Sequence, residues 1–392
     1  MSSEVTVWSS SSNVSEDRET ETVDRISSDP AALASAPGGG SESADVRARA
    51  RVPRSVLRAA VRGAAIVVVV ALLASLPLLV TDYVLSAILV PVLALALAGI
   101  GQNLITGYAG QLCVGSAAFM SVGAFATYDA SSHVHGLPLL ASFALGGVVA
   151  GLVGVFFGLP SLRIRGFYLV VSTLAAQFFV VWLFTKVGWF SDYSASGVIT
   201  APRLAVAGFD LSSPGGHYWL SLLVVAPLTV LGRNLVRGRL GRSWMAVRDM
   251  ETAAAVVGVR TGRAKLLAFG IGSFYCGVAG ALWAFAYLGT VEPHGLDLDR
   301  SFQVLFIVIL GGLGSIAGPF VGAAFVILFP VALDQLGSAL VGGSVDPGLL
   351  QNAEKIIFGA LVILLLIKQP AGMARLLQIA WIRISRWRPR SA

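Results

Sequence analysis

Residues 268–288 read AFGIGSFYCGVAGALWAFAYL and contain no Asp, Glu, Lys or Arg. About 20 helical residues cross the roughly 30 Å hydrocarbon core of a bilayer, because a helix rises about 1.5 Å per residue. A second charge-free segment covers residues 64–80, and its Val, Ile and Leu side chains favour membrane insertion by about 3 to 6 kcal/mol. Both segments predict helices that span a membrane.

The composition of the whole chain agrees with these two segments. Of its 392 residues, 56% are hydrophobic and only 12% are charged, whereas soluble domains carry about 25% charged residues. We therefore predict an all-α integral membrane protein, a polytopic bundle of about 8–10 transmembrane helices. The candidate spans are 62–80, 83–102, 108–130, 137–160, 166–187, 217–232, 265–289, 301–313, 316–336 and 352–368.

Two of these spans have features of broken or re-entrant segments. Span 108–130 is interrupted by glycine, and span 301–313 is short for a full crossing. The glycines concentrate in GYAGQLCVG at 107–115 and in GGLGSIAGP at 311–319. Plain close packing of helices explains them as well as broken helices do. The glycines that we expect to be structural are Gly107, Gly110, Gly115, Gly311, Gly312, Gly314 and Gly318.

The two ends of the chain differ from its centre. Residues 1–58 are rich in Ser, Ala, Asp and Glu, which predicts a disordered cytoplasmic tail before a transmembrane domain at 59–372. Residues 373–392 alternate Leu, Ile and Trp with Arg, a pattern typical of a basic tail at the membrane interface. Cys113 and Cys276 lie in apolar segments, so we expect buried thiols rather than a disulfide.

The distribution of basic residues predicts the orientation. With the N-terminus inside and the spans alternating, the cytoplasmic segments from Arg47 onward hold 22 Lys and Arg and the outer segments hold four, Lys186, Arg203, Arg300 and Lys355. This asymmetry satisfies the positive-inside rule and predicts that both termini are cytoplasmic. It also explains the pI of about 9.7, so the charge does not require a nucleic-acid partner.

Chemistry-bearing residues are scarce within the predicted spans. Ionisable side chains occur only near span ends, which argues against a proton-coupled carrier but leaves carbonyl-based sodium sites open. Paired carboxylates and activated nucleophiles are absent, which argues against a membrane enzyme. No phosphate-binding loop occurs, so ATP-driven transport would need an ATPase on another chain. We expect no cofactor, and His133 and His135 read as loop histidines without a third metal ligand.

Several polar residues could line a transport path. The best candidates by position are Gln111, Ser116, Tyr168, Thr173 and Gln177. Thr173 and Gln177 share one helix face because they are four residues apart. Hydrogen bonds between helices explain these residues equally well.

A predicted cytoplasmic loop at 233–264 contains GRSWMAVRDMETAAAVVG at 241–258. Asp249 is expected to cap the N-terminus of a short helix and Gly258 to end it. Such a helix would expose the apolar residues 253–257 and would need a partner surface. A membrane surface and another protein fit this requirement equally well.

Glu251-Thr-Ala-Ala followed by Gly258 resembles the coupling loop by which permease subunits of ABC importers engage their ATPases. Further similarity lies in GYAGQLCVGSAAFMSVGAF at 107–125, RIRGFYLVVSTL at 163–174, SGVITAP at 196–202, the block 241–320 and residues 358–373. Over residues 60–373 the chain resembles the M-type membrane subunit of high-affinity branched-chain amino-acid importers. It departs from that family at Ser116, where a His is common, and around Gln177, where an acidic residue is common.

The resemblance implies a function and partners. The chain would form part of the path for leucine, isoleucine and valine, or for urea or short amides, in a bacterial plasma membrane. Its expected partners are a homologous permease subunit in a heterodimer, two cytoplasmic ATPases, an external solute-binding protein and membrane lipid. The residues that the resemblance assigns to coupling are Arg248, Asp249, Glu251, Ala253 and Gly258. The competing hypothesis is an ATP-independent carrier or channel.

Overall fold

The computed structural model describes residues 77, 81–134, 137–162, 167–190, 198–202, 205–206, 209–211, 213–292 and 294–341, and separate positions between 356 and 373. The chain divides after Ala65, and all described residues belong to the second unit, Ile66–Ala392. The predicted tail 1–58, most of span 62–80, most of span 352–368 and nearly all of the tail 373–392 lie outside the described residues.

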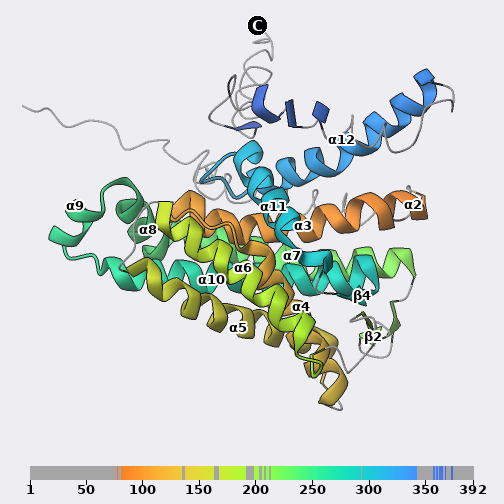
Figure 1. The fold of residues 1–392 in the computed structure, drawn as a ribbon, viewed down its shortest axis with the longest axis horizontal. Coiled ribbons are helices and arrows are strands. Elements are labelled where there is room, and N and C mark those ends of the chain that lie inside the picture. Colours follow the sequence, from red (N-terminus) through yellow and green to blue (C-terminus); the bar gives the residue numbers. More distant parts are fainter. Residues whose placement is uncertain are drawn as a thin grey trace, which may run out of the picture. The chain divides into compact units, whose positions relative to one another are not determined.

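The described part of the chain consists mainly of helices (Figure 1). In chain order the helices are α2 (Asp82–Val84), η1 (Leu85–Leu89), α3 (Val90–Asn103), η2 (Leu104–Tyr108), α4 (Ser116–His133), α5 (Leu139–Gly158), η3 (Leu159–Leu162), α6 (Phe167–Lys186), α7 (Pro214–Arg237), α8 (Arg239–Asp249), α9 (Glu251–Val256), α10 (Thr261–Leu282), η4 (Trp283–Leu288), η5 (His294–Leu296), α11 (Leu298–Gly311) and α12 (Gly318–Val341). Of these, η1, η2 and η4 are π-helical, and η3 and η5 are 3₁₀ turns.

Five helical stretches within the described residues are long and apolar enough to cross a membrane. They are Asp82–Tyr108, Leu139–Gly158, Tyr168–Lys186, Pro214–Arg237 and Thr261–Leu288. A further apolar stretch, Gly318–Leu333, forms much of α12. These helices confirm the predicted all-α membrane fold.

Four short strands form two small antiparallel pairs. Strand β1 (Ile199–Thr200) pairs with β4 (Thr290–Val291), and β2 (Ala205–Val206) pairs with β3 (Phe209–Asp210). Strand β4 directly follows η4, so the β1–β4 pair lies at the end of the bundle remote from α8 and α9 (Figure 1). The pairs therefore tie together connections and add little to the core.

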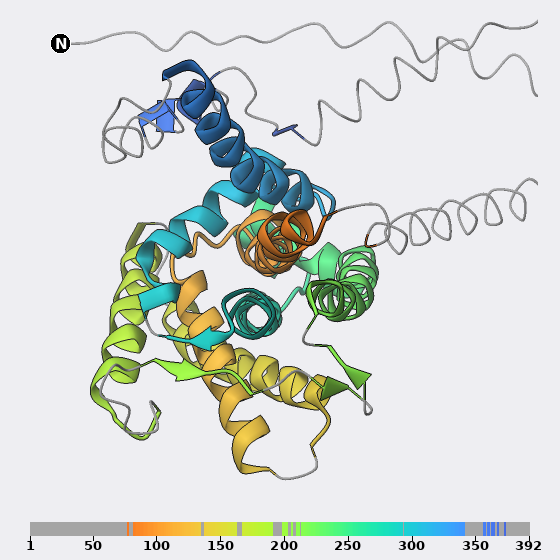
Figure 2. The ribbon, with the colours of Figure 1, turned by 90° about the vertical axis from the view of Figure 1, so that its right-hand side faces the viewer.

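The helix that contains the charge-free residues 268–288 forms the centre of the bundle. Helix α10 packs against α3, α4 and α5, and Figure 2 shows it end-on among them. Its side chains Phe269, Tyr275 and Cys276 are almost completely buried, as is Cys113, and both cysteines are free thiols as predicted. An apolar helix that is buried on nearly all sides is typical of the core of a membrane bundle.

Glycines bring α10 into backbone contact with its neighbours. A Cβ on Gly101 of α3 would lie 2.5 Å from the carbonyl oxygen of Gly272, and a Cβ on Gly123 of α4 would overlap the backbone of Gly277. Small residues allow such approaches, and van der Waals packing then stabilises helix association in lipid. The central helix is therefore held by backbone proximity on at least two sides.

The helices break at the two glycine-rich segments. The stretch that begins at Asp82 ends at Tyr108, residues 109–115 are not helical, and α4 begins at Ser116. The predicted span 108–130 is therefore not one continuous helix. Helix α11 has 14 residues and is about 21 Å long, and residues 312–317 separate it from α12. We call residues 109–115 the first break and residues 312–317 the second break.

Substitution of Gly123 by Val tests the backbone contact between α4 and α10. The added side chain overlaps Gly277, and forced overpacking of a core costs about 1–3 kcal/mol. We expect a clearly lower midpoint of thermal aggregation for the detergent-solubilised protein. Gly215→Ala is the control, because a Cβ there meets nothing within 4 Å. Equal midpoints for the two variants would contradict the close contact.

Candidate functional site

The loop between α7 and α10 forms two helices rather than the single short helix predicted. Helix α8 continues to Asp249, Met250 is extended with φ −153° and ψ 98°, and α9 covers Glu251–Val256. The predicted N-cap role of Asp249 is therefore wrong, because this residue is the last of α8 and α9 has no side-chain cap. Helix α8 extends so far because its Trp244 and Val247 face the core, which stabilises the preceding turns.

Gly258 ends α9 as predicted. It has φ +92°, its N–H donates to the carbonyl of Ala255 (3.0 Å), and the N–H of Val259 donates to the carbonyl of Ala254 (2.9 Å). These two bonds satisfy carbonyls that the helix end would leave unpaired. The left-handed conformation favours glycine, so the sequence signal at this position was specific.

Helix α9 presents an apolar surface to its surroundings. Val256 is 88% exposed and Val257 is 84% exposed, and Met250 before the helix is also exposed. Ala253 is exposed, while Ala254 is buried against the rest of the protein. A helix of six residues that exposes such side chains gains stability from a covering partner.

Helices α8 and α9 are fixed to the start of α10 by two polar contacts. The indole Nε1 of the fully buried Trp244 donates to the carbonyl of Ala264 at 2.9 Å. The Nζ of Lys265 lies 2.7 Å from Oε1 of Glu251, and the Lys265 side chain is only 9% exposed. Such a mostly buried, charge-assisted contact is stronger than a surface ion pair. Glu251, one of the predicted coupling residues, is therefore part of the attachment of α9.

Arg248 connects α8 to the first break. Its Nη1 donates to the carbonyl of Gly107 at 2.9 Å, while Nε and Nη2 both lie 2.9 Å from Oδ1 of Asp249. Gly110 has φ +70°, and a Cβ there would lie 2.7 Å from Cγ of Arg248. The arginine side chain therefore lies against the backbone of the first break, and Asp249 holds its guanidinium in place.

Asn103, the last residue of α3, bonds to the second break. Its Oδ1 accepts from the N–H of Gly314 at 2.9 Å, and its Nδ2 donates to the carbonyl of Ser315 at 2.7 Å. A Cβ on Gly107 would lie 2.6 Å from the nitrogen of Gly314, so only glycine permits this approach. We call Asn103, Gly107, Arg248, Gly314 and Ser315 the coupling cluster.

The other predicted structural glycines lie within or beside the two breaks. A Cβ on Gly115 would lie 2.6 Å from the carbonyl oxygen of Thr173, and Gly311 and Gly318 approach each other's backbone across the second break. Gly312 has φ +111° and adjoins Gly311. These contacts bring the end of α11 and the start of α12 together.

Three of the predicted path residues lie together inside the protein. Thr173 Oγ1 accepts from the N–H of Val114 (3.1 Å), and Gln177 Oε1 accepts from the hydroxyl of Ser301 (3.0 Å). The hydroxyl oxygen of Ser301 accepts from the N–H of Ala117 (2.9 Å). Ser116, the third, begins α4 beside Ala117 and is buried, and its hydroxyl has no partner within the described residues. We call Thr173, Gln177 and Ser301, together with the adjoining Ser116, the polar clamp, because the bonds of Ser301 to Ala117 and Gln177 join α4, α6 and α11.

The other two predicted path residues lie apart from the polar clamp. Gln111 is buried in the first break, where its Nε2 is 3.4 Å from the carbonyl of Lys265. Tyr168 is 73% exposed near the start of α6. Trp244, Lys265 and Ser301 were not among the predicted site residues. The position of Lys265, directly before the charge-free residues 266–288, was the one signal that could have indicated a buried ion pair.

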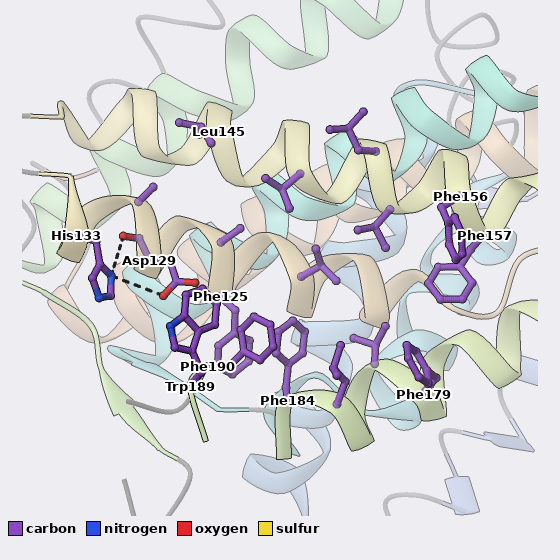
Figure 3. Close-up of a pocket in the computed structure, with 18 of the residues that line it drawn as sticks. Phe125, Asp129, His133, Leu145, Phe156, Phe157, Phe179, Phe184, Trp189 and Phe190 are labelled. Atoms are coloured by element: carbon purple, nitrogen blue, oxygen red, sulfur yellow. Dashed lines mark hydrogen bonds and ion pairs between the residues drawn. The ribbon is translucent and has the colours of Figure 1, made fainter. Parts of the chain in front are cut away.

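A cavity of about 870 Å³ runs between α4, α5 and α6 (Figure 3). Its lining is apolar and aromatic, with Phe125 and Phe184 stacked at 4.3 Å between ring centroids. Asp129 and His133 are at one end, 3.9 Å apart. Among the described residues no group of three or more His, Cys, Asp or Glu could hold a metal ion, and His135 lies outside them. The cavity suits hydrocarbon better than a polar solute.

Known proteins resemble this chain over most of its membrane part. Residues 84–366 match the family described as branched-chain amino acid transport system / permease component. The high-affinity branched-chain amino acid transport system permease protein LivM of Salmonella typhimurium is 30% identical over 299 residues, which cover 70% of this chain and 66% of the relative. LivM of Escherichia coli K12 is 29% identical with the same coverage. The chain thus matches just under two thirds of the length of these relatives.

A relative with a different name matches a shorter part of the chain. The autoinducer 2 import system permease protein LsrC of Klebsiella pneumoniae is 30% identical over 200 residues, which cover 49% of this chain and 53% of the relative. No solved structure matches the chain.

Replacement of Lys265 by Gln tests the attachment of α9. Glu251 would lose a charge-assisted contact that stabilises the attached position of α9. Local opening of the helix becomes easier, so amide hydrogen exchange in residues 251–258 should rise about tenfold. Arg263→Gln is the matched control, because it removes the same charge from an exposed position two residues away. Unchanged exchange in Lys265→Gln, measured by mass spectrometry, would show that the ion pair does not hold α9.

Proposed function

This chain belongs to the branched-chain amino acid transport system permease family, and on that premise we propose that it is a permease subunit of an ATP-driven importer. We further propose that it forms part of the translocation path for leucine, isoleucine and valine. Two relatives named for branched-chain amino acid transport match 70% of the chain, whereas the autoinducer 2 relative matches 49%. This difference in coverage favours amino acids as the substrate class.

The coupling cluster is the observation that carries this proposal. Arg248 at the end of α8 binds the backbone at Gly107, and Asn103 binds Gly314 and Ser315 in the second break. The exposed α9 follows α8 directly in the sequence, and the ion pair between Glu251 and Lys265 attaches it to α10. A force applied to α9 would therefore act on α10 and, through Arg248, on both breaks.

The proposed importer needs several partners. Two cytoplasmic ATPases would drive the importer, and one of them would cover α9 with Val256 and Val257 in an apolar groove of its surface. A homologous permease subunit would complete a heterodimeric path, and an external solute-binding protein would deliver the amino acid. The basic residues of the α7–α10 connection favour a cytoplasmic position for α8 and α9, with both chain termini on that side of the bacterial plasma membrane.

The predicted site residues have distinct proposed roles. Five residues act in coupling. Arg248 bonds to Gly107, Asp249 orients the guanidinium of Arg248, and Glu251 attaches α9 to α10. Ala253 is exposed on α9, and Gly258 ends this helix. Ser116, Thr173 and Gln177 act in gating, because the polar clamp holds three helices together at the start of α4. Gln111 would respond directly to movement of the first break. Tyr168 would face the partner permease subunit or lipid.

Reconstitution tests the proposed function against an ATP-independent carrier. We expect accumulation of radiolabelled leucine in vesicles only when the sister permease, the ATPases, the binding protein and ATP are all present. Among the described residues, no Asp or Glu is buried within a predicted span, so an ion gradient has no carboxylate through which to drive uptake. Accumulation against a gradient by this chain alone would overturn the proposal.

Val256→Glu tests the role of α9. A charged side chain at an 88% exposed position should leave the fold intact but prevent apolar docking, so ATPase association and uptake should fall at least about tenfold. Arg239→Gln is the matched control, since it changes the charge of exposed α8 by the same unit. Co-purification of the ATPase and leucine uptake are the measurements. Wild-type association of Val256→Glu would count against the docking surface.

A further inference from the structure

A second group of polar residues lies at the end of the bundle remote from α9. Arg300 is in the first turn of α11, and its guanidinium lies 4.2 Å from the ring centroid of Trp283 in η4. The ring of Tyr287 lies 4.5 Å from that of Trp283 between centroids at an angle of 51°, and Gln303 accepts a hydrogen bond from Nη1 of Arg300. We call Trp283, Tyr287, Asp297, Arg300 and Gln303 the Arg300 cluster.

The Arg300 cluster contains two buried hydrogen-bond donors without an acceptor. Nε of Arg300 and Nε1 of Trp283 are both buried, and neither has a partner within the described residues. No carboxylate of the described residues forms an ion pair with Arg300, although Asp297 and Asp299 are its acidic neighbours. Native proteins seldom leave such donors unsatisfied, because desolvation without a bond is costly. Both unsatisfied donors belong to one pair of side chains, because the guanidinium of Arg300 lies over the ring of Trp283.

The surroundings of Arg300 also favour a ligand. π-helical turns such as η4 occur frequently at functional sites. The cationic side chain sits at the N-terminal end of α11, where the helix dipole already favours negative charge. Both features raise the positive potential at the same place.

We propose that the Arg300 cluster binds the α-carboxylate of the amino-acid substrate. The planar guanidinium of Arg300 and the indole N–H of Trp283 donate to the carboxylate oxygens, which is the geometry that arginine recognises best. Asp297 and Asp299 provide negative charge for the α-ammonium group of the same zwitterion. This assignment rests on the proposed importer function and names the substrate group that the permease recognises.

The position of the cluster fits the entrance of a transport path. Trp283 follows Lys265 by 18 residues of a nearly continuous helix, so the Arg300 cluster lies about 27 Å along α10 from the attachment of α9. That distance approaches the thickness of the hydrocarbon core. With α9 in the cytoplasm, the Arg300 cluster faces the side from which a binding protein delivers its ligand.

A purely structural role for Arg300 makes a different prediction. The cation–π contact with Trp283 would then be the whole function of the side chain, and a lysine would replace it with little loss. A carboxylate site instead needs the forked guanidinium and the indole N–H. Arg300→Lys and Trp283→Phe, which keep a cation and an aromatic ring, therefore separate the two roles.

The assembled importer in proteoliposomes provides the test, with leucine-loaded binding protein outside and ATP inside. We expect Arg300→Gln to lower leucine uptake per ATP hydrolysed by about ten- to a hundredfold. Trp283→Phe and Arg300→Lys should also lower it, while stimulation of ATP hydrolysis by the binding protein persists. Lys186→Gln, which removes another cation near the same end from an exposed position, should not change uptake.

The possible outcomes separate the site from the importer function. Wild-type vesicles without ATP-dependent uptake would refute the importer and not the site. In that case the carboxylate site is tested by the thermal shifts of the purified complex with L-leucine and with L-leucinamide, because only leucine carries the carboxylate. A leucine-specific shift that Arg300→Gln abolishes supports the site. Uptake per ATP within twofold of wild type in Arg300→Gln, or equal shifts with leucinamide, would overturn it.

Discussion

A helix that breaks inside a membrane bundle exposes backbone N–H and C=O groups, and these groups must be bonded within the protein because lipid offers no partners. Two glycine-rich breaks create this need here. Asn103 and Arg248 satisfy three of the freed groups, at Gly107, Gly314 and Ser315. Thr173 and Ser301 satisfy the N–H groups of Val114 and Ala117 at the start of α4. The breaks therefore explain why Asn103, Thr173 and Ser301 are buried polar residues.

The sequence indicated where the helices break but not what binds them. Glycine density at 107–115 and 311–319 predicted both breaks, because glycine lowers helix stability and permits positive φ. The residues that bond the breaks are separated from them by 59 to 212 positions in the chain. A single sequence carries no pairing signal over such distances, so interhelical bonding and a solvent-lined path remained equal hypotheses for Thr173 and Gln177.

Local signals in the coupling loop were reliable only where one residue type was required. Gly258 was correctly predicted because a positive φ at a helix end favours glycine. Asp249 was wrongly predicted as a cap because tertiary contacts of Trp244 extend α8 beyond its local preference. The Glu251–Lys265 ion pair was not predicted, because a single sequence carries no signal that pairs two residues in different helices.

Helix α11 is the element through which the two ends of the molecule can affect each other. Its first turn carries Arg300, and Ser301 joins it to α4 and α6. Its last residue, Gly311, enters the second break that Asn103 holds and Arg248 adjoins. From Arg300 to Gly311 the helix is about 16 Å long, too short to bend appreciably. Under the proposed function, any shift of the second break moves Arg300 against Trp283 in η4, which continues helix α10, and α10 is fixed by its glycine contacts. Coupling of this kind is reciprocal, so a ligand that stabilises one position of Arg300 must equally bias the position of α8 and α9.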